Sequence, residues 1–176
     1  VTFEPALENL VLNGMPLNVV EIFDSNVNGY VSVVPIECPQ DGRIVVDLRS
    51  NKGLKGFDFS NLFSTTHFNT STCHYHIDLS DNPKLDTDIL VKNSPTLEKH
   101  GANMFIRIAG VELECGCPLV NLYKSKNLQN NIHSVQCKGE NGKYLDEIVN
   151  DPVKTKNCTP TTQPPPTTTT KKPNSS

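Results

Sequence analysis

Two histidines and a cysteine stand close together in the segment CHYH, Cys73–His76. Alternate residues of a β-strand point to the same face, so His74 and His76 would share one face with Asp78 if this segment is extended. Imidazole and carboxylate groups together are the ligand types of a zinc site. No further ligand lies nearby in the sequence, and histidine pairs of this kind are usually ordinary strand residues. We therefore predict no metal site and no cofactor.

A second group of residues with metal-binding chemistry consists of Cys115, Cys117, Cys137 and Cys158. A zinc knuckle has two or more residues between its first pair of ligands, whereas Gly116 alone separates the first two cysteines, so we exclude zinc. Cysteines one residue apart in an extended chain point to opposite sides and would take different disulfide partners. The whole chain has six cysteines, an even number, which favours disulfides.

Composition and motif content argue against several classes of protein. The 176 residues carry a net charge of −3 with both signs interspersed, whereas a nucleic-acid-binding surface would be basic. No apolar run reaches the roughly 18 residues of a membrane-spanning helix, so membrane attachment would need sequence beyond Ser176. The chain also lacks the motifs of serine hydrolases, zinc proteases, P-loop proteins and dinucleotide-binding enzymes. We predict that it is not an enzyme.

Glycosylation signals indicate the secretory pathway. Sequons occur at Asn69 (NTS) and Asn174 (NSS), and we predict that both are glycan acceptors. A third sequon, NCT at Asn157, contains Cys158, and a disulfide at that cysteine would hinder glycan addition. Disulfides persist in oxidising compartments, so we expect a secreted or cell-surface protein.

Residues 159–176, TPTTQPPPTTTTKKPNSS, differ in composition from the rest of the chain. They contain no side chain that would anchor them in a core, and threonine with proline favours an extended, O-glycosylated stalk. A plain disordered terminus is the alternative on composition alone. In both cases the folded part is expected to end near Cys158.

The folded part contains a weak internal repeat of the form L-x-x-L-x-L. It matches four segments: Leu7–Leu17, Arg43–Leu54, His74–Leu85 and Asn103–Leu113. In the second segment a short strand would point Val46 and Leu48 to one side. Asn51 and Asn82 follow at the turn, where an amide can hydrogen-bond the backbone of neighbouring coils. Because one coil cannot bury its apolar side alone, such coils stack.

The segments VDLRSNKGL and IDLSDNPKL resemble leucine-rich repeats, and VELECGCPLVNLY with its later cysteines resembles the C-terminal cap of extracellular leucine-rich-repeat proteins. The resemblance implies the disulfides Cys115–Cys137 and Cys117–Cys158, with a helix after the second cysteine. The long, irregular coils also resemble the receptor L-domains of the insulin and epidermal growth factor receptor families, which are right-handed β-solenoids as well. The chain departs from the leucine-rich-repeat pattern at Met15 and Val111, where asparagine is expected.

We therefore predict an α/β repeat solenoid. Residues 1–114 would form a short right-handed stack of leucine-rich-repeat-type coils with a parallel sheet on one face. Residues 115–158 would form the disulfide-bonded cap, and 159–176 the stalk. Cys38 and Cys73 precede strands on adjacent coils, and we predict that they form the third bridge, which would stabilise the fold by roughly 3–4 kcal/mol in the chain-entropy model.

Both ends of the coil stack carry apolar residues. Pro118 suits the first turn of the cap helix, and three residues of one helix face would cover the last coil: Leu119, Leu122 and Tyr123. The N-terminal end has no cysteine-containing cap. Its apolar residues offer a surface through which two copies would form a homodimer: Leu7, Leu10 and Leu12.

Residues that flank the core leucines would line the open face of the sheet. Five of them are suited to binding another protein: Arg49, Asp78, Asp81, Phe105 and Arg107. An exposed aromatic with arginines and carboxylates is typical of protein-binding patches, although a merely solvated face would have similar polarity. We predict a non-enzymatic extracellular module that recognises a protein in adhesion, signalling or immune recognition. The alternative is a structural extracellular-matrix glycoprotein without a specific ligand face.

Overall fold

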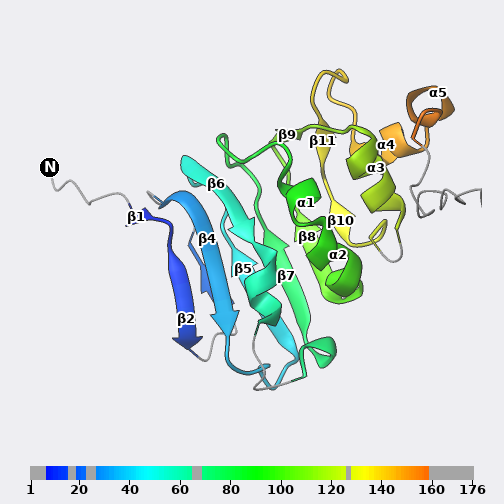
Figure 1. Ribbon diagram of the computed structural model, residues 1–176. Helices are drawn as coiled ribbons and strands as arrows, with labels where there is room; N and C mark the ends of the chain where they lie inside the picture. The colour runs from blue at the N-terminus through cyan, green and yellow to red at the C-terminus, as the bar shows by residue number, and fades with distance from the viewer. Residues whose placement is uncertain (1–6, 16–18, 23–26, 65–68, 126–127, 159–176) are drawn as a thin grey trace, which may run out of the picture.

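Two parallel β-sheets form the frame of the molecule (Figure 1). The computed structural model describes residues 7–15, 19–22, 27–64, 69–125 and 128–158. In the first sheet β4 (Val27–Pro35) lies between its neighbours, which are β1 (Leu7–Glu8), β2 (Val11–Met15) and β6 (Gly53–Asp58). The second sheet has the order β10-β8-β7-β5-β3. Its strands are β3 (Val19–Glu21), β5 (Arg43–Asp47), β7 (His74–Asp78), β8 (Met104–Arg107) and β10 (Ile132–His133).

From β2 to β7, successive strands alternate between the two sheets. β2 is followed by β3, β4 by β5, and β6 by β7, so each pass along the first sheet precedes a pass along the second. Before β8, the helices α1 (Ile89–Lys92) and α2 (Ser94–His100) lie beside β6 in place of another strand (Figure 1). The valines of β4 favour an extended strand, whereas Pro95 in the first turn of α2 favours the start of a helix. The protein is therefore a mixed α/β fold.

Alternation along the strands of the second sheet separates an inner from an outer face. In β7, Tyr75 and Ile77 are buried, whereas His76 lies on the opposite side and is half-buried. The register places Ile77 opposite Val46 on one side and Ile106 on the other, so the buried residues form continuous rows. A shift by one residue would expose the whole row, which is why this register is strongly specified.

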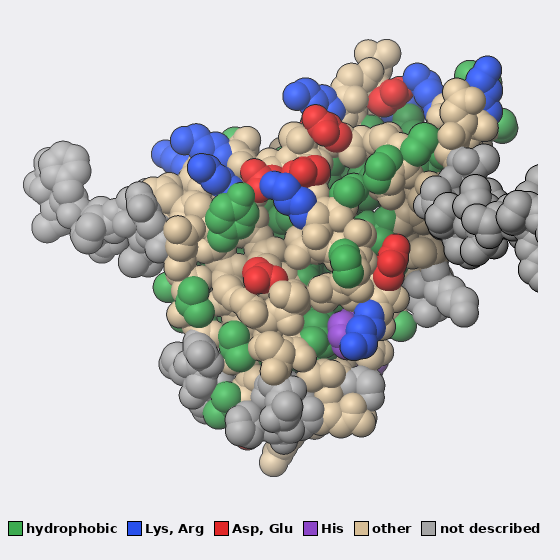
Figure 2. Space-filling view, viewed as in Figure 1, with side chains coloured by type: hydrophobic (Ala, Val, Ile, Leu, Met, Phe, Trp, Pro, Cys, Tyr) green, Lys and Arg blue, Asp and Glu red, His purple; other side chains and the backbone are tan. Residues whose placement is uncertain are grey.

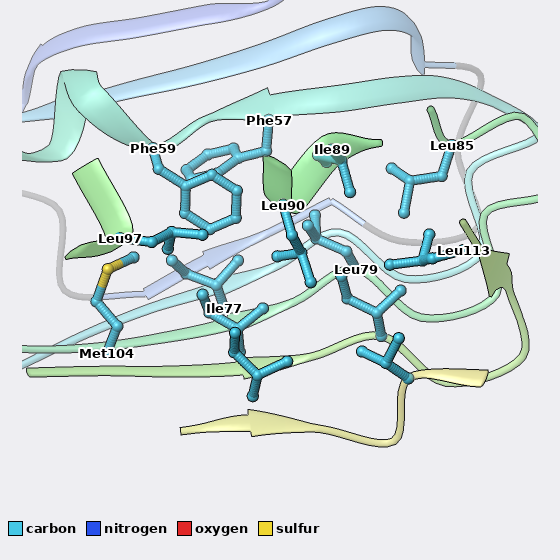
Figure 3. Close-up of a cluster of buried hydrophobic side chains, with 14 of the residues drawn as sticks. Phe57, Phe59, Ile77, Leu79, Leu85, Ile89, Leu90, Leu97, Met104 and Leu113 are labelled. Carbon is cyan, nitrogen blue, oxygen red and sulfur yellow. The ribbon is translucent and has the colours of Figure 1, made fainter. Parts of the chain in front are cut away.

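The hydrophobic core lies between the two layers (Figure 3). Phe57 from β6 and Phe59 from the short 3₁₀ helix η1 (Phe59–Phe63) pack edge to face, with ring centroids 5.1 Å apart. Leu90 and Leu97 of the two helices lie on the same side of the core, and Ile77 faces them from the second sheet. The helices thus cover the part of the core that the first sheet leaves uncovered.

Two buried asparagines tie the turns of the second sheet together, as the sequence predicts. Asn82 Oδ1 accepts a hydrogen bond from the Asn51 backbone N–H at 2.7 Å, and Asn82 Nδ2 donates to the carbonyl oxygens of Leu48 and Leu79 at 3.0 and 2.8 Å. Asn51 Nδ2 donates to Leu48 at 2.9 Å and to Ile22 at 2.7 Å. Buried backbone groups need such partners, and an apolar residue supplies none.

Three disulfides join the pairs that the sequence predicts: Cys38–Cys73, Cys115–Cys137 and Cys117–Cys158. The last two surround helix α3 (Cys117–Lys124), which has Pro118 in its first turn. Its residues Leu119 and Leu122 are buried and Tyr123 is half-buried, so the predicted burial of this helix face is confirmed. The other elements of this region are β9 (Glu112–Leu113), β11 (Gln136–Cys137), α4 (Leu145–Val149) and α5 (Pro152–Thr155).

Two expectations about the sheets were wrong. The repeat pattern aligns Leu7–Leu17 with the strands of the second sheet, but β1 and β2 pair with β4, and β3 occupies the edge beside β5. A parallel sheet also lies on each side of the core rather than on one face only. The reason is that β4 and β6 bury a second set of side chains, including Val31 and Val33, whose valine pattern the leucine alignment does not detect.

The N-terminal end of the sheets differs in detail from the predicted apolar surface. Leu10 and Leu12 are partly buried against the core, and the side chain of Leu7 lies outside the described residues. The exposed apolar residues at this end are Val11 and Val19, with 61% and 48% of their surface accessible. The homodimer stays a prediction.

Candidate functional site

The outer face of the five-stranded sheet carries side chains from four adjacent strands and the turns that follow them. We call this set the outer strip; it consists of Asp47, Arg49, His76, Asp78, Phe105, Arg107 and His133. The parallel register aligns them in rows, with Asp47 opposite Asp78, Asp78 opposite Arg107, and Arg107 opposite His133. Four of the five predicted binding residues therefore belong to one contiguous surface.

Three aromatic rings stack across the outer strip. The ring centroids of His76 and Phe105 lie 4.4 Å apart with an interplanar angle of 29°, and those of Phe105 and His133 lie 4.4 Å apart at 23°. His133 also forms a 2.7 Å hydrogen bond with the Asn130 carbonyl oxygen through Nε2. These contacts hold the rings in one orientation, because each ring restricts the rotamers of its neighbour.

The environment of His76 favours its neutral form. Partial burial of the imidazole lowers its pKa, and the positive charge of Arg43 lowers it further, while Asp78 and Asp47 oppose the shift. A neutral ring stacks on Phe105 without a desolvation penalty for a buried charge.

Arginines and carboxylates form a network beside the rings. Arg49 Nε and Nη2 donate to Asp47 Oδ1 and Oδ2 at 2.9 and 2.8 Å, and Arg107 Nη1 lies 3.3 Å from Asp78 Oδ2. Arg49 Nε lies 4.0 Å from the same Asp78 oxygen, which links the two pairs. The arginine side chains are 46% and 42% exposed, whereas the two aspartates are 15% and 14% exposed. The guanidinium groups are therefore the part of the network that a partner would contact.

Ser80 is also hydrogen-bonded to this network. It is buried, and its Oγ accepts hydrogen bonds from the Ala109 backbone N–H at 2.8 Å and from Arg107 Nη1 at 3.3 Å. The hydroxyl thus fixes the position of Arg107 relative to the end of β8.

Asp81, the fifth predicted binding residue, lies beyond the end of β7. Its backbone has a φ of +59°, its N–H donates to the Ala109 carbonyl oxygen at 2.8 Å, and its exposed side chain lies against Gly110. A side chain at position 110 would collide with the Asp81 carboxylate, and the φ of Gly110 is +72°. Asp81 therefore borders the outer strip and takes part in the packing of two successive turns.

Three members of the outer strip are not among the predicted binding residues: Asp47, His76 and His133. His133 lies on a strand of only two residues, Ile132–His133, which is too short for an alternation signal. Asp47 is not predicted from the sequence as a binding residue, because its pairing with Arg49 depends on side-chain geometry, and His76 is considered there only as a possible metal ligand. The tripeptide Asp47-Leu48-Arg49 is the signal that was present, since residues two apart in a strand share a face.

The opposite face of the molecule has a different character. Figure 2 shows that acidic and basic side chains intermingle there and that apolar side chains are scattered. Tyr30 is 47% exposed, and its hydroxyl donates to Asp86 Oδ2 at 2.8 Å. Lys92 Nζ lies 3.1 Å from Asp86 and 3.4 Å from Asp88. Phe63 of η1 stacks on His100 at the end of α2 with ring centroids 3.8 Å apart, and it also contacts the buried Tyr75 at 4.7 Å, so this ring pair lies beside the core rather than in a row across a sheet face.

The predicted glycosylation sites and the histidines considered as metal ligands lie apart from one another in the chain. Asn69 is exposed and directly precedes the 3₁₀ helix η2 (Thr70–Thr72), whereas Asn174 lies outside the described residues, as does the whole predicted stalk. His74 and His76 do share the outer face of β7. Within the described part of the chain, no group of three or more metal-ligating side chains comes together.

Comparisons of this chain with protein-family models, with curated proteins and with solved structures find no match. Among the described residues, no helix has the length and apolar character needed to cross a membrane. Three disulfides are typical of extracellular proteins.

Proposed function

We propose that this chain is a non-enzymatic, extracellular protein-recognition module and that the outer strip is its binding surface. The observation that carries the proposal is the stack of His76, Phe105 and His133 beside two exposed arginines. Aromatic residues and arginines contribute most of the binding free energy at many protein interfaces. A secreted or cell-surface location is part of the same proposal.

Fixed side chains favour binding because little entropy is lost when a partner contacts them. Ordering a flexible side chain at an interface costs about 0.5–1.5 kcal/mol. On the outer strip, Phe105 is held between two imidazoles, and Arg107 is held by Asp78 and Ser80. A partner would therefore meet a surface that needs little rearrangement.

We also propose that the two sheets belong to a short solenoid of the kind that the sequence resembles. The alternation of strands between sheets, the linked asparagines and the disulfides around α3 support this reading. Because a parallel sheet lies on each side of the core, the receptor L-domain resemblance gains support relative to a leucine-rich repeat with one sheet. In solenoids a sheet face is a usual binding surface, which agrees with the proposed role of the outer strip.

A binding screen tests the proposal. The secreted chain, multimerised to raise its avidity, is presented to an array of extracellular domains. We expect at least one partner whose binding is saturable. The double variant Phe105→Ala/Arg107→Ala should no longer capture this partner, whereas the control Lys55→Ala should capture it normally. A chain that finds no saturable partner but is incorporated into insoluble matrix would instead support the structural glycoprotein alternative.

A further inference from the structure

A hollow of about 480 Å³ lies where β10 meets the C-terminal helices. Aromatic and acidic side chains from three segments line it, namely Tyr123 of α3, His133 of β10, Tyr144 before α4, and Asp146 and Glu147 of α4. The volume is within the range of small-ligand pockets, about 300–1,000 Å³. His133 belongs both to this hollow and to the outer strip, so the hollow adjoins the strip.

The lining residues are held in place by local contacts. Glu147 Oε2 accepts a hydrogen bond from the Tyr144 backbone N–H at 2.7 Å, which fixes the start of α4. Tyr144 remains 44% exposed at the rim. Tyr123 is half-buried, and both its burial and the negative charge of Asp146 raise its pKa, so the carboxylate acts on the phenol. The rings and the carboxylates therefore belong to one site.

The charge in the hollow is not balanced by the described part of the protein. No described lysine or arginine side chain forms an ion pair with Asp146 or Glu147, whereas the carboxylate of Glu140 nearby in sequence is paired with Lys154 at 2.9 Å. A pair of carboxylates beside two tyrosine rings attracts a cation in two ways. The carboxylates accept charge-assisted hydrogen bonds, and the ring faces attract positive charge.

We propose that this hollow binds a cationic side chain, arginine or lysine, of a protein partner. Charge complementarity identifies this occupant: an anionic group would be repelled by both carboxylates, and an apolar group would desolvate them without supplying a positive charge. The site goes beyond the proposed role of the outer strip and does not depend on it, because its chemistry is complete within Tyr123, Tyr144, Asp146 and Glu147.

The test is a titration of the isotope-labelled, disulfide-intact chain followed by nuclear magnetic resonance. The probes are N-acetyl-arginine amide, N-acetyl-lysine amide and the neutral isostere N-acetyl-citrulline amide. We expect saturable shifts of the amide signals around Tyr144 and Asp146 with at least one cationic probe, and binding of the citrulline compound weaker by roughly tenfold.

Variants distinguish binding at this site from a general attraction of cations to an acidic protein. Asp146→Asn and Tyr144→Leu change exposed side chains, and each should weaken the binding of the cationic probe several-fold. Tyr144→Phe keeps the ring and should bind the probe normally. Glu98→Gln removes the same charge from the exposed face of α2 and is the matched control. The proposal is overturned if no probe saturates, if citrulline binds as tightly as arginine, or if Glu98→Gln weakens binding as much as Asp146→Asn.

Discussion

At the scale of single residues, Asn82 shows how one side chain holds several backbone groups. Its amide contacts the Asn51 N–H and the carbonyl oxygens of Leu48, Leu79 and Ser80, all within 3.2 Å. The side chain is fully buried, so water does not replace these contacts when they are lost. Leaving a buried donor or acceptor unpaired costs about 1–3 kcal/mol.

We expect Asn82→Ala to lower the free energy of unfolding by about 3 kcal/mol, because several buried backbone groups lose their partner together. Denaturant unfolding with the disulfides intact measures the change. The control Asn130→Ala replaces an exposed amide and should change stability by less than about 0.5 kcal/mol. Equal stability of the two variants would show that the asparagine contacts do not stabilise the turns.

The second residue-scale prediction concerns the protonation of His76. Burial lowers its pKa below the ordinary 6.5, so at a pH between the two values the unfolded chain binds more protons than the folded chain. The contribution of His76 to stability is therefore complete above pH 6.5 and is lost as the pH falls towards its folded pKa. A nuclear magnetic resonance titration of the ring should give a pKa below 6.5, and Arg43→Gln should raise it. A measured pKa above 6.5 would contradict the partly buried, stacked position.

At the scale of elements, helix α3 covers the end of the core. Leu119, Val120 and Leu122 are almost completely buried, and two disulfides begin at or beside the helix. The helix has only eight residues, which is too short for stability on its own. Packing and the disulfides must therefore hold it.

Leu122→Asp places a carboxylate in this packing, and we expect a loss of about 3 kcal/mol or more in unfolding free energy. Thermal unfolding of the oxidised protein measures it. Lys124→Ala on the exposed side of the same helix should unfold at nearly the wild-type temperature. If both variants melt like the wild type, then α3 does not cover the core in solution.

Sequence patterns predicted the elements that repeat and missed those that do not. Strands β5, β7 and β8 follow the leucine and isoleucine alternation, and Asn51 and Asn82 follow from the same alignment. The first sheet was missed because β4 and β6 use valine, glycine and phenylalanine, and Gly53 allows β6 to approach Asn28 closely. The stack of Phe105 on two histidines depends on rotamers and register, and neither is encoded in a short-range pattern.

At the scale of the whole molecule, the two outer faces have different characters. One face belongs to the five-stranded sheet and carries the outer strip. The other face, shown in Figure 2, belongs to the first sheet and helices α1 and α2 (Figure 1). Among the described strand residues, each face carries one partly exposed phenylalanine or tyrosine, Phe105 on β8 and Tyr30 on β4. These two residues offer a matched pair of positions for deciding which face binds.

The most direct test of the outer strip is the affinity of Phe105→Ala and Tyr30→Ala for the partner that the screen identifies, measured by surface plasmon resonance. Truncating an interface anchor commonly costs 2 kcal/mol or more, so Phe105→Ala should bind about 30-fold more weakly than the wild type. Tyr30→Ala should bind within about twofold of the wild type, because its face makes no contact with the partner. The opposite pattern, with Tyr30→Ala weakened and Phe105→Ala unchanged, would contradict the assignment of the binding surface.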